Sequence, residues 1–297
     1  MRSYLFVPAD SPRKLEKSLI SGADALIFDL EDAVSQARKP EGRRELRRFL
    51  SEAGNTGRAT PKLFVRVNAL DTGMTLSDLA AVMPYSPDGI VLPKCRGAQD
   101  LRLLSSYLDV FEHIYPSPQP APTSIIAIVT ETADSLAGLN EYRGSSSRLA
   151  GMMWGAEDLS GDIGALANTD EASPSGWTDP FTLVRSLCLF AAAAAGVQAI
   201  DTVPTEINNP ERLLLQTQRA YRDGFTAKAA IHPGQVPVIN QGMTPDVERQ
   251  EWARSVVAAF EQNTEVGVAT LDGKMLDLPH LKLARRILAA SGPVSQA

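Results

Sequence analysis

The sequence is poor in features that would assign it to several protein classes. It has only two cysteines, Cys95 and Cys188, which lie far apart without the spacing of metal ligands. This scarcity argues against a zinc site or a disulfide framework and makes a reducing compartment the default. No stretch approaches the roughly 20 apolar residues needed to cross a membrane, and the N-terminus lacks the apolar core of a signal sequence. We therefore expect a cytoplasmic protein without a membrane partner.

An excess of positive charge is also missing. The 297 residues include 29 Lys and Arg against 35 Asp and Glu, a net charge of -6. No nucleic-acid partner is expected, because phosphate backbones are bound by clustered Lys and Arg. A small anionic ligand needs only a few cations or a metal, so that class of ligand stays open. With 44% hydrophobic and 22% charged residues, the chain is otherwise typical of a globular protein.

What the sequence does contain is an alternation of short apolar runs with longer segments of helical periodicity. Most runs are apolar on both faces, which is typical of parallel strands buried on both sides. Eight such units predict an α/β fold, the (β/α)8 TIM barrel. Strands are expected at 3–9, 25–31, 62–68, 89–94, 124–132, 151–158, 198–205 and 227–234. Helices are expected at 11–21, 39–53, 75–83, 98–111, 182–197, 209–224 and 244–263, with a short turn near 134–139.

The expected domain organisation is one barrel over residues 1–262, followed by a C-terminal arm over residues 263–297. The Pro- and Ser-rich segments 116–122 and 168–180 are interpreted as loops, because the alternation continues through both. The arm contains the hairpin-like VATLDGKML and a final helix, which are surplus to a barrel. Such an arm is typical of a contact across a subunit interface.

Polar residues concentrate at the C-terminal ends of the expected strands, where barrels of this class carry their active sites. Glu131 and Asp158 close consecutive strands, whose backbones should lie about 4.8 Å apart. Two carboxylates that close repel each other unless a cation lies between them, and oxygen ligands without His or Cys favour Mg2+ or Mn2+. The pair is therefore predicted to bind Mg2+ or Mn2+. The alternatives are a helix cap for Asp158 and a solvated loop position for either acid.

A second candidate is Arg66, a lone guanidinium in the apolar strand LFVRVN. Because an unpaired buried Arg is costly, a salt bridge to Glu31 or Asp32 is one interpretation. A clamp on a substrate carboxylate or enolate is the other. The turn at Gly155 and Ala156 offers backbone N–H groups to a substrate carboxylate. The adjacent Glu157 is a further candidate substrate contact, with a solvated loop position as its alternative.

Three more residues at strand ends or on the arm have open roles. Lys94 in VLPK is compatible with a Schiff base or with a salt bridge to the acids, and the salt bridge is favoured because a metal would already supply the electrophile. His232 is interpreted as structural. Asp277 interrupts an apolar run ahead of Leu278 and Pro279, which favours a role in a neighbouring subunit's site.

Together these segments resemble a known family, the citrate lyase beta-subunit-like or CoA ester lyase branch of the HpcH/HpaI aldolase superfamily. The resemblance keeps the family's motif order and covers nearly the whole chain. It is carried by RSYLFVPADSPRKLEKSL, DALIFDLEDAV, FVRVN, GIVLPK, IVTET, WGAEDL, AIHPGQV and DGKMLDLPHLK.

The resemblance implies a Mg2+-dependent barrel enzyme that cleaves or forms a carbon-carbon bond between an acyl-thioester enolate and a keto acid. It implies that Glu131 and Asp158 are metal ligands and that Arg66 holds substrate oxygens. It also implies that Asp277, in MLDLP with Leu276 where the family has Ile, acts in a neighbouring subunit's site. The CoA moiety would be contacted by Arg2, Tyr4, Phe6 and Lys14. These four positions could equally serve barrel closure.

The resulting hypothesis is a lyase that converts a 3-hydroxy-dicarboxyl-CoA thioester into acetyl-CoA and a 2-keto acid. Citramalyl-CoA, malyl-CoA and citryl-CoA are the candidate substrates, and the sequence does not choose between them. The resemblance implies a homotrimer or a hexamer. Two alternatives stay open: an aldolase acting on free pyruvate or oxaloacetate without CoA, and a non-catalytic ligand-binding barrel. The non-catalytic barrel is disfavoured by the presence of Glu131, Asp158, Arg66 and Asp277, since a protein that only binds needs no base.

Overall fold

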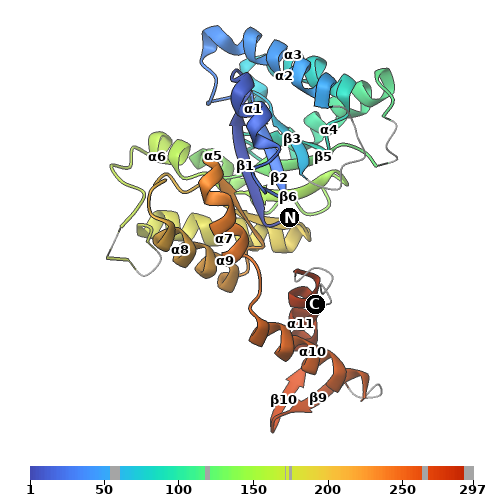
Figure 1. Ribbon diagram of the computed structural model, residues 1–297, viewed down its shortest axis with the longest axis vertical. Helices are drawn as coiled ribbons and strands as arrows, with labels where there is room; N and C mark the ends of the chain where they lie inside the picture. Colours follow the sequence, from blue (N-terminus) through green and yellow to red (C-terminus); the bar gives the residue numbers. More distant parts are fainter. Residues whose placement is uncertain (54–60, 118–120, 171, 174–175, 263–266, 291–297) are drawn as a thin grey trace. The chain divides into compact units, whose positions relative to one another are not determined.

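Eight parallel strands close into a barrel within the part of the chain that the structure describes (Figure 1). This computed structural model describes residues 1–53, 61–117, 121–170, 172–173, 176–262 and 267–290. Strands adjacent in sequence pair with each other, and β1 pairs with β8 to complete the ring. The strands are β1 (Ser3–Pro8), β2 (Ala25–Asp29), β3 (Lys62–Arg66), β4 (Gly89–Leu92), β5 (Ser124–Ile128), β6 (Leu149–Met153), β7 (Gln198–Asp201) and β8 (Ala227–Ala230). The predicted TIM barrel is confirmed.

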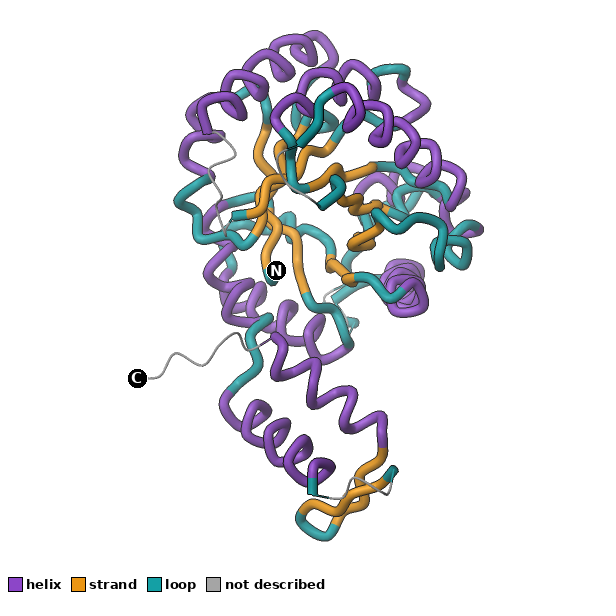
Figure 2. The backbone as a smooth tube through the Cα atoms, turned by 90° about the vertical axis from the view of Figure 1, so that its right-hand side faces the viewer, coloured by secondary structure: helices purple, strands orange, loops and turns teal. Residues whose placement is uncertain are grey.

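Helices surround these strands, and Figure 2 shows them in purple outside the orange barrel. They are α1 (Pro12–Ser18), α2 (Lys39–Ala53), α3 (Thr75–Val82), α4 (Ala98–Ile114), α5 (Ala133–Ala137), α6 (Glu157–Ile163), α7 (Asp179–Ala195), α8 (Pro210–Asp223) and α9 (Val236–Gly242). Short 3-10 turns are η1 (Gln36–Arg38), η2 (Leu70–Thr72), η3 (Met83–Tyr85) and η4 (Pro233–Gln235). Among the described residues, no helix is both long and apolar enough to span a membrane.

The strands end earlier than predicted at the end that carries the polar residues. The strand expected at 124–132 ends at Ile128, and the strand expected at 151–158 spans Leu149–Met153. After residues 154–156, the chain instead begins α6 at Glu157, a helix that was not predicted. Its first turn contains two carboxylates, which favour a helix N-terminus because they oppose the positive end of the helix dipole. The loops expected at 116–122 and 168–180 lie partly outside the described residues.

The barrel is filled by every second side chain of its strands. Tyr4, Ile27, Phe64, Val91 and Ile126 belong to one buried cluster inside it. The intervening side chains face outward and are buried under the helices, as with Leu26 and Phe28, which have no exposed surface. Burial on both faces explains why the strands read as continuous apolar runs.

A second compact unit begins at Gln241, earlier than the boundary expected at residue 263. It contains α10 (Val247–Glu261), the antiparallel hairpin β9 (Val268–Leu271) and β10 (Lys274–Asp277), and α11 (Leu278–Ala290). The boundary moves because α10 packs with the hairpin and α11 in a separate apolar cluster, which includes Val256, Phe260, Leu276 and Ile287. The hairpin itself is confirmed. Its turn residues Asp272 and Gly273 both have positive φ, at 49° and 73°, as a type I′ turn requires.

Candidate active site

A cavity of about 350 Å³ lies at the C-terminal ends of the barrel strands. Its wall includes three of the residues predicted to act on a substrate, Arg66, Glu131 and Asp158. Gly155, Ala156 and Glu157, which were also predicted to contact a substrate, line the same cavity. The structure therefore brings together side chains that are separated by up to 92 positions in the sequence (158 − 66).

Glu131 is a buried carboxylate just beyond β5. Only 3% of its surface is exposed, and its Oε2 accepts a hydrogen bond of 2.5 Å from the backbone N–H of Lys94. Burial raises the pKa of Glu131 to about 8, and the charges of Glu31 and Asp158 contribute to that rise. Arg66 opposes the effect without cancelling it. Glu131 is thus a carboxylate that is costly to ionise until a further cation arrives.

Arg66 is held in one orientation by two carboxylates. Its Nε and Nη2 donate to the two oxygens of Asp29 at 2.8 and 2.6 Å, and Nη1 lies 2.7 Å from Oε2 of Glu31. Asp29 and Arg66 are register partners on β2 and β3. Burial alone would lower the pKa of Arg66, but the neighbouring carboxylates raise it overall. Of the two predicted salt-bridge partners, Glu31 is confirmed, whereas Asp32 contacts Lys94 instead.

The side chain of Lys94 joins three of the acids. Its ammonium lies 2.5 Å from Glu31, 3.1 Å from Asp32 and 3.1 Å from Asp158. Burial would lower the pKa of Lys94, but Glu31 and the other carboxylates raise it overall. Lys94 is therefore an ammonium ion, which confirms the salt-bridge interpretation and disfavours a Schiff base, because that reaction needs the free amine.

The backbone of Lys94 is also unusual. Its φ of 50° lies in the left-handed region, where a residue with a side chain costs about 1–3 kcal/mol. That conformation directs its N–H to Glu131 and its ammonium to Asp158. One strained residue thus contacts both predicted metal ligands.

The charges around the cavity fit a divalent cation. Five carboxylates gather there: Asp29, Glu31, Asp32, Glu131 and Asp158. They face Arg66 and Lys94, and the ammonium of Lys39 donates to the nearby backbone carbonyls of Leu30 and Glu31. With all five ionised, negative charge would exceed positive charge by two (5 − 3), an excess that a divalent cation would neutralise. Oxygen-rich sites of this kind suit Mg2+, which uses one or two protein carboxylates and keeps its other positions for water and substrate.

Gly155 makes room for Glu131. A Cβ atom at position 155 would lie 2.6 Å from Cγ of Glu131, which is closer than carbon atoms can pack. The N–H of Gly155 donates to the hydroxyl of Thr130 at 3.1 Å. This differs from the prediction that Gly155 offers its N–H to a substrate, because that donor already has a partner within the protein.

The neighbours of Gly155 also line the cavity. Ala156 is buried beside the first turn of α6, whereas Glu157 is exposed. The carboxylate of Glu157 accepts a hydrogen bond of 2.8 Å from the amide of Asn168. Asp158 is not the N-cap of α6, since Ala156 has that position. The capping alternative for Asp158 is therefore wrong.

The four residues expected to contact CoA do not gather in one place. Phe6 lines the cavity, and the guanidinium of Arg66 lies over its ring at 5.0 Å. Lys14 is exposed in α1. Arg2 precedes β1 and pairs with Asp24 at the opposite end of the barrel. Tyr4 is 1% exposed inside the barrel, where its hydroxyl donates to Gln198. For Arg2 and Tyr4 the geometry supports barrel closure.

The two remaining candidates have local partners. Nδ1 of His232 accepts a hydrogen bond from the N–H of Gly234 at the start of η4, which confirms its structural interpretation. Asp277 ends β10 in the second unit, and its Oδ1 lies 2.5 Å from Nδ1 of His280. A hydrogen bond to His280 lowers the pKa of Asp277, so this carboxyl group is readily ionised.

Two residues of the site were not singled out from the sequence. Asp29 holds Arg66 through hydrogen bonds. The sequence feature that could have identified Asp29 is its position at the end of the strand that neighbours the strand of Arg66. Trp154 lines the cavity and its indole N–H donates to buried Asp201 at 2.7 Å. No local pattern predicts that contact, because its partners are 47 residues apart.

Comparison with known proteins gives a consistent result along the chain. A sequence model of the HpcH/HpaI aldolase/citrate lyase family matches residues 2–233. The chain is 28% identical over 307 residues to the mitochondrial citramalyl-CoA lyase of Mus musculus, covering 99% of this chain and 87% of that protein. It is 31% identical over 296 residues to the (3S)-malyl-CoA thioesterase of Cereibacter sphaeroides, covering 99% and 95%.

The fold comparison agrees with the sequence comparison. The protein CitE from Mycobacterium tuberculosis, solved in complex with magnesium, acetoacetate and coenzyme A, is similar with a TM-score of 0.74. The two chains are 32% identical, and the similarity covers 98% of each. Since the family model spans most of the sequence and its relatives align along nearly all of it, the chain belongs to the HpcH/HpaI aldolase/citrate lyase family of enzymes.

Proposed function

We propose that this enzyme is a Mg2+-dependent carbon-carbon lyase that cleaves, or forms, a 3-hydroxy-dicarboxyl-CoA thioester to give acetyl-CoA and a 2-keto acid. One observation carries the proposal: the cavity that holds the carboxylate pair Glu131 and Asp158 also holds the fixed guanidinium of Arg66. A cation site and an oxyanion site side by side suit a substrate that carries a carboxylate, a hydroxyl group and a thioester. The named relatives and the magnesium and coenzyme A bound to CitE support the same assignment.

Glu131 and Asp158 are the residues that would hold Mg2+. When bound, the ion would neutralise the excess carboxylate charge, orient the substrate's carboxylate and hydroxyl oxygens, and acidify that hydroxyl. The backbone N–H of Lys94 positions Glu131, while the ammonium of Lys94 contacts Asp158. Lys94 thus keeps both ligands oriented toward the cavity.

Arg66 would stabilise the charge that develops on the thioester. As the carbon-carbon bond breaks, its electron pair moves toward the thioester oxygen and an enolate forms. Arg66 has five N–H donors, of which Asp29 engages one on Nε and one on Nη2, while Nη1 lies within ion-pair distance of Glu31. Each terminal nitrogen therefore keeps a second N–H for the enolate oxygen. Donors fixed before the reaction are worth more than donors that must reorient.

Water would take the proton that the substrate hydroxyl loses, and Asp277 of a neighbouring subunit, after taking up a proton from solvent, would give it to the enolate carbon. In the reverse direction the same carboxylate would remove a proton from the methyl group of acetyl-CoA, a role worth about 10²- to 10⁴-fold in rate. His280 orients Asp277 through the contact at Oδ1. This part of the proposal requires an oligomer, and a homotrimer or hexamer fits the family.

The CoA moiety would enter past Phe6, which lines the cavity, and Lys14, whose exposed ammonium suits a phosphate. The alternative is an aldolase of the same family that acts on free pyruvate or oxaloacetate. That enzyme would need the cation site and Arg66 but no CoA contacts. Binding of CoA thioesters therefore separates the two functions.

The test is to incubate the purified protein and Mg2+ with malyl-CoA, citramalyl-CoA and citryl-CoA in separate reactions. Keto acid, acetyl-CoA and free CoA would each be quantified, because hydrolysis releases CoA without a keto acid. Glu131→Gln removes the proposed ligand charge at nearly constant size. Asp134→Asn is the matched control, since it neutralises an exposed acid three residues away on α5.

The expected result is equimolar keto acid and acetyl-CoA from one thioester, abolished by EDTA and by Glu131→Gln but not by Asp134→Asn. Release of free CoA without a keto acid would indicate that the enzyme is a thioesterase and not a lyase. If no thioester reacts while pyruvate or oxaloacetate is turned over with Mg2+, the free-acid aldolase becomes the function to pursue.

A further inference from the structure

A second cavity, of about 270 Å³, lies on the outer side of the barrel between α7 and α8. Asp201 of β7 and Lys228 of β8 form its floor. Their neighbours Ile200, Ala227 and Ala229 fill the barrel interior, so Asp201 and Lys228 face outward by strand alternation. This cavity shares no lining residue with the candidate active site.

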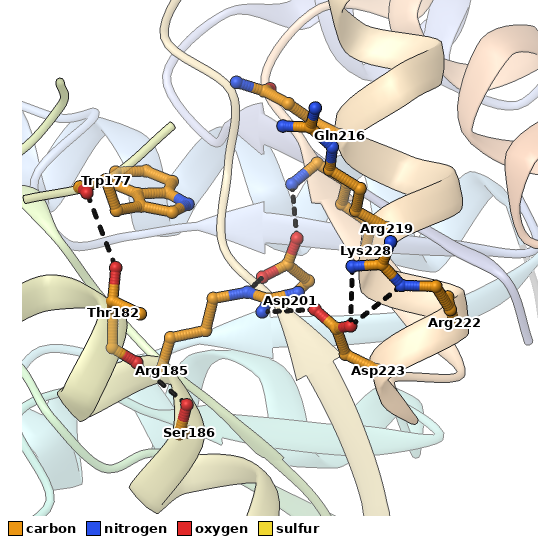
Figure 3. Close-up of a pocket in the computed structure, with 10 residues that line it drawn as sticks. All are labelled: Trp177, Thr182, Arg185, Ser186, Asp201, Gln216, Arg219, Arg222, Asp223 and Lys228. Carbon is orange, nitrogen blue, oxygen red and sulfur yellow. Dashed lines mark hydrogen bonds and ion pairs between the residues drawn. The ribbon is translucent and has the colours of Figure 1, made fainter. Parts of the chain in front are cut away.

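Cationic side chains dominate the lining of this second cavity. Arg185, Arg219, Arg222 and Lys228 contribute four positive charges, and Asp201 and Asp223 contribute two negative charges. The excess is two positive charges (4 − 2), in a protein whose net charge is -6. Figure 3 shows that Arg185 extends toward Asp201 from one side, while Arg219 and Arg222 come from the helix opposite.

The floor of the cavity is a buried network of ion pairs. Asp201 and Lys228 are 3% and 2% exposed, and Nζ of Lys228 donates to Oδ2 of Asp201 at 2.7 Å. Arg185 bridges the two acids, with Nε 3.3 Å from Asp201 and Nη1 2.9 Å from Asp223. Burial alone would raise the pKa of Asp201, but Lys228 and Arg185 lower it overall, so Asp201 is an anion.

From this charge and shape we propose that the cavity between α7 and α8 binds a small, doubly charged oxyanion. Guanidinium groups match the paired oxygens of phosphate and carboxylate, and several of them converge here. The volume is below the roughly 300–1,000 Å³ of sites for drug-sized ligands, which favours a ligand of a few heavy atoms over a nucleotide. Inorganic phosphate and a short dicarboxylate share the required chemistry.

The cavity has a direct link to the candidate active site. Oδ1 of Asp201 accepts a hydrogen bond from the indole N–H of Trp154, and Trp154 lines the active-site cavity. Trp177 lines the second cavity, and its ring centroid lies 4.9 Å from that of Trp154. An anion that draws Arg185 or Lys228 toward itself would change the surroundings of Asp201 and both indoles. Binding should therefore alter tryptophan fluorescence.

The experiment titrates the full-length protein with inorganic phosphate and, separately, with succinate, by calorimetry and tryptophan fluorescence at low ionic strength. The variant Arg219→Gln with Arg222→Gln removes two exposed cations of α8 that line the cavity. Its matched control is Arg44→Gln with Arg47→Gln, which removes the same charge from an exposed face of α2. Gln216→Glu is a second variant, which adds a negative charge to the lining and keeps every arginine.

The expected result is one anion bound per chain, with affinity at least about tenfold weaker in the α8 double variant and in Gln216→Glu but unchanged in the α2 control. Binding of phosphate alone, of succinate alone or of both identifies the ligand chemistry and supports the site. Failure of both anions to bind would overturn it. Equal affinity in the wild type and the two cavity variants would also overturn it, because the anion would then be bound elsewhere.

Discussion

Replacing Gly155 with alanine tests how closely the position of Glu131 controls the active site. The added Cβ would lie 2.6 Å from Cγ and 3.3 Å from Oε1 of Glu131. Carbon atoms pack at about 3.5–4.0 Å, so the Glu131 side chain must retreat by roughly 1 Å. The backbone of Gly155 is not in the left-handed region, so the effect comes from the side-chain clash.

The displacement sets the size of the expected effects. Overpacking of a buried site costs about 1–3 kcal/mol, and we expect the free energy of unfolding to fall by that amount. A misplacement of 1 Å at a catalytic group can cost about 10²-fold in rate, so the turnover number should fall by a similar factor. The affinity for Mg2+ should fall as well, because Glu131 is one of its two proposed ligands.

Gly161→Ala is the matched control. Gly161 lies in α6, and a Cβ atom there would have no heavy atom within 4 Å. The change should therefore raise helix stability by about 0.5–1 kcal/mol and leave Mg2+ affinity unchanged. Urea unfolding, calorimetric titration of Mg2+ and thioester cleavage would measure the three effects. If Gly155→Ala bound Mg2+ and turned over substrate as the wild type does, the proposed role of Glu131 would be refuted.

Three further predictions concern Arg66, the subunit interface and pH. Arg66→Lys should lower turnover by at least about tenfold, because lysine cannot replace the bidentate contact with Asp29; steady-state kinetics would show this, and full activity would contradict it. Glu131→Gln and Asp277→Asn should each be inactive but regain about a quarter of wild-type activity when co-assembled, since about one site in four would combine intact residues from two neighbours. No recovery in verified mixed oligomers would place Asp277 outside the shared site. Burial alone would raise the pKa of Glu112, but hydrogen bonds from Arg148 and Thr123 lower it overall. The contribution of Glu112 to stability is therefore present above about pH 4.3, and it is lost as the pH falls through the folded-state pKa. The gap in unfolding free energy between the wild type and Glu112→Gln should shrink on acidification, and a constant gap from pH 3 to 7 would refute this.

Local patterns were sufficient to predict the barrel and the end at which its site lies. Each strand is a short apolar run such as ALIFD at β2, and alternation with helices fixes the parallel barrel. Glu131 and Asp158 line one cavity because consecutive strands are neighbours in a barrel, which the sequence order already implied. Asp277 was predicted from the apolar run that it interrupts and from the family resemblance, and its role stays a prediction.

Other features depended on contacts that no local pattern contains. The pairing of Arg66 with Asp29 follows from the strand register, which a sequence leaves undetermined. The second unit begins at Gln241 because α10 buries its apolar face against α11 and the hairpin. The helical pattern in the sequence does not show which segments the helix packs against. Trp154 was expected within a strand, and its indole hydrogen bond depends on Asp201, which is distant in the sequence.

The crowding of carboxylates around Lys94 has a consequence for how the protein evolves. Burial and the charges of Glu31 and Asp158 make Glu131 costly to ionise, so in the metal-free protein the carboxylate cluster is a locally frustrated part of an otherwise consistent fold. A change such as Glu131→Gln would remove that cost and stabilise the barrel, yet it would also weaken the attraction for a divalent cation. Selection for stability and selection for catalysis therefore act in opposite directions at these few positions, and a gain in melting temperature there is a warning of lost function.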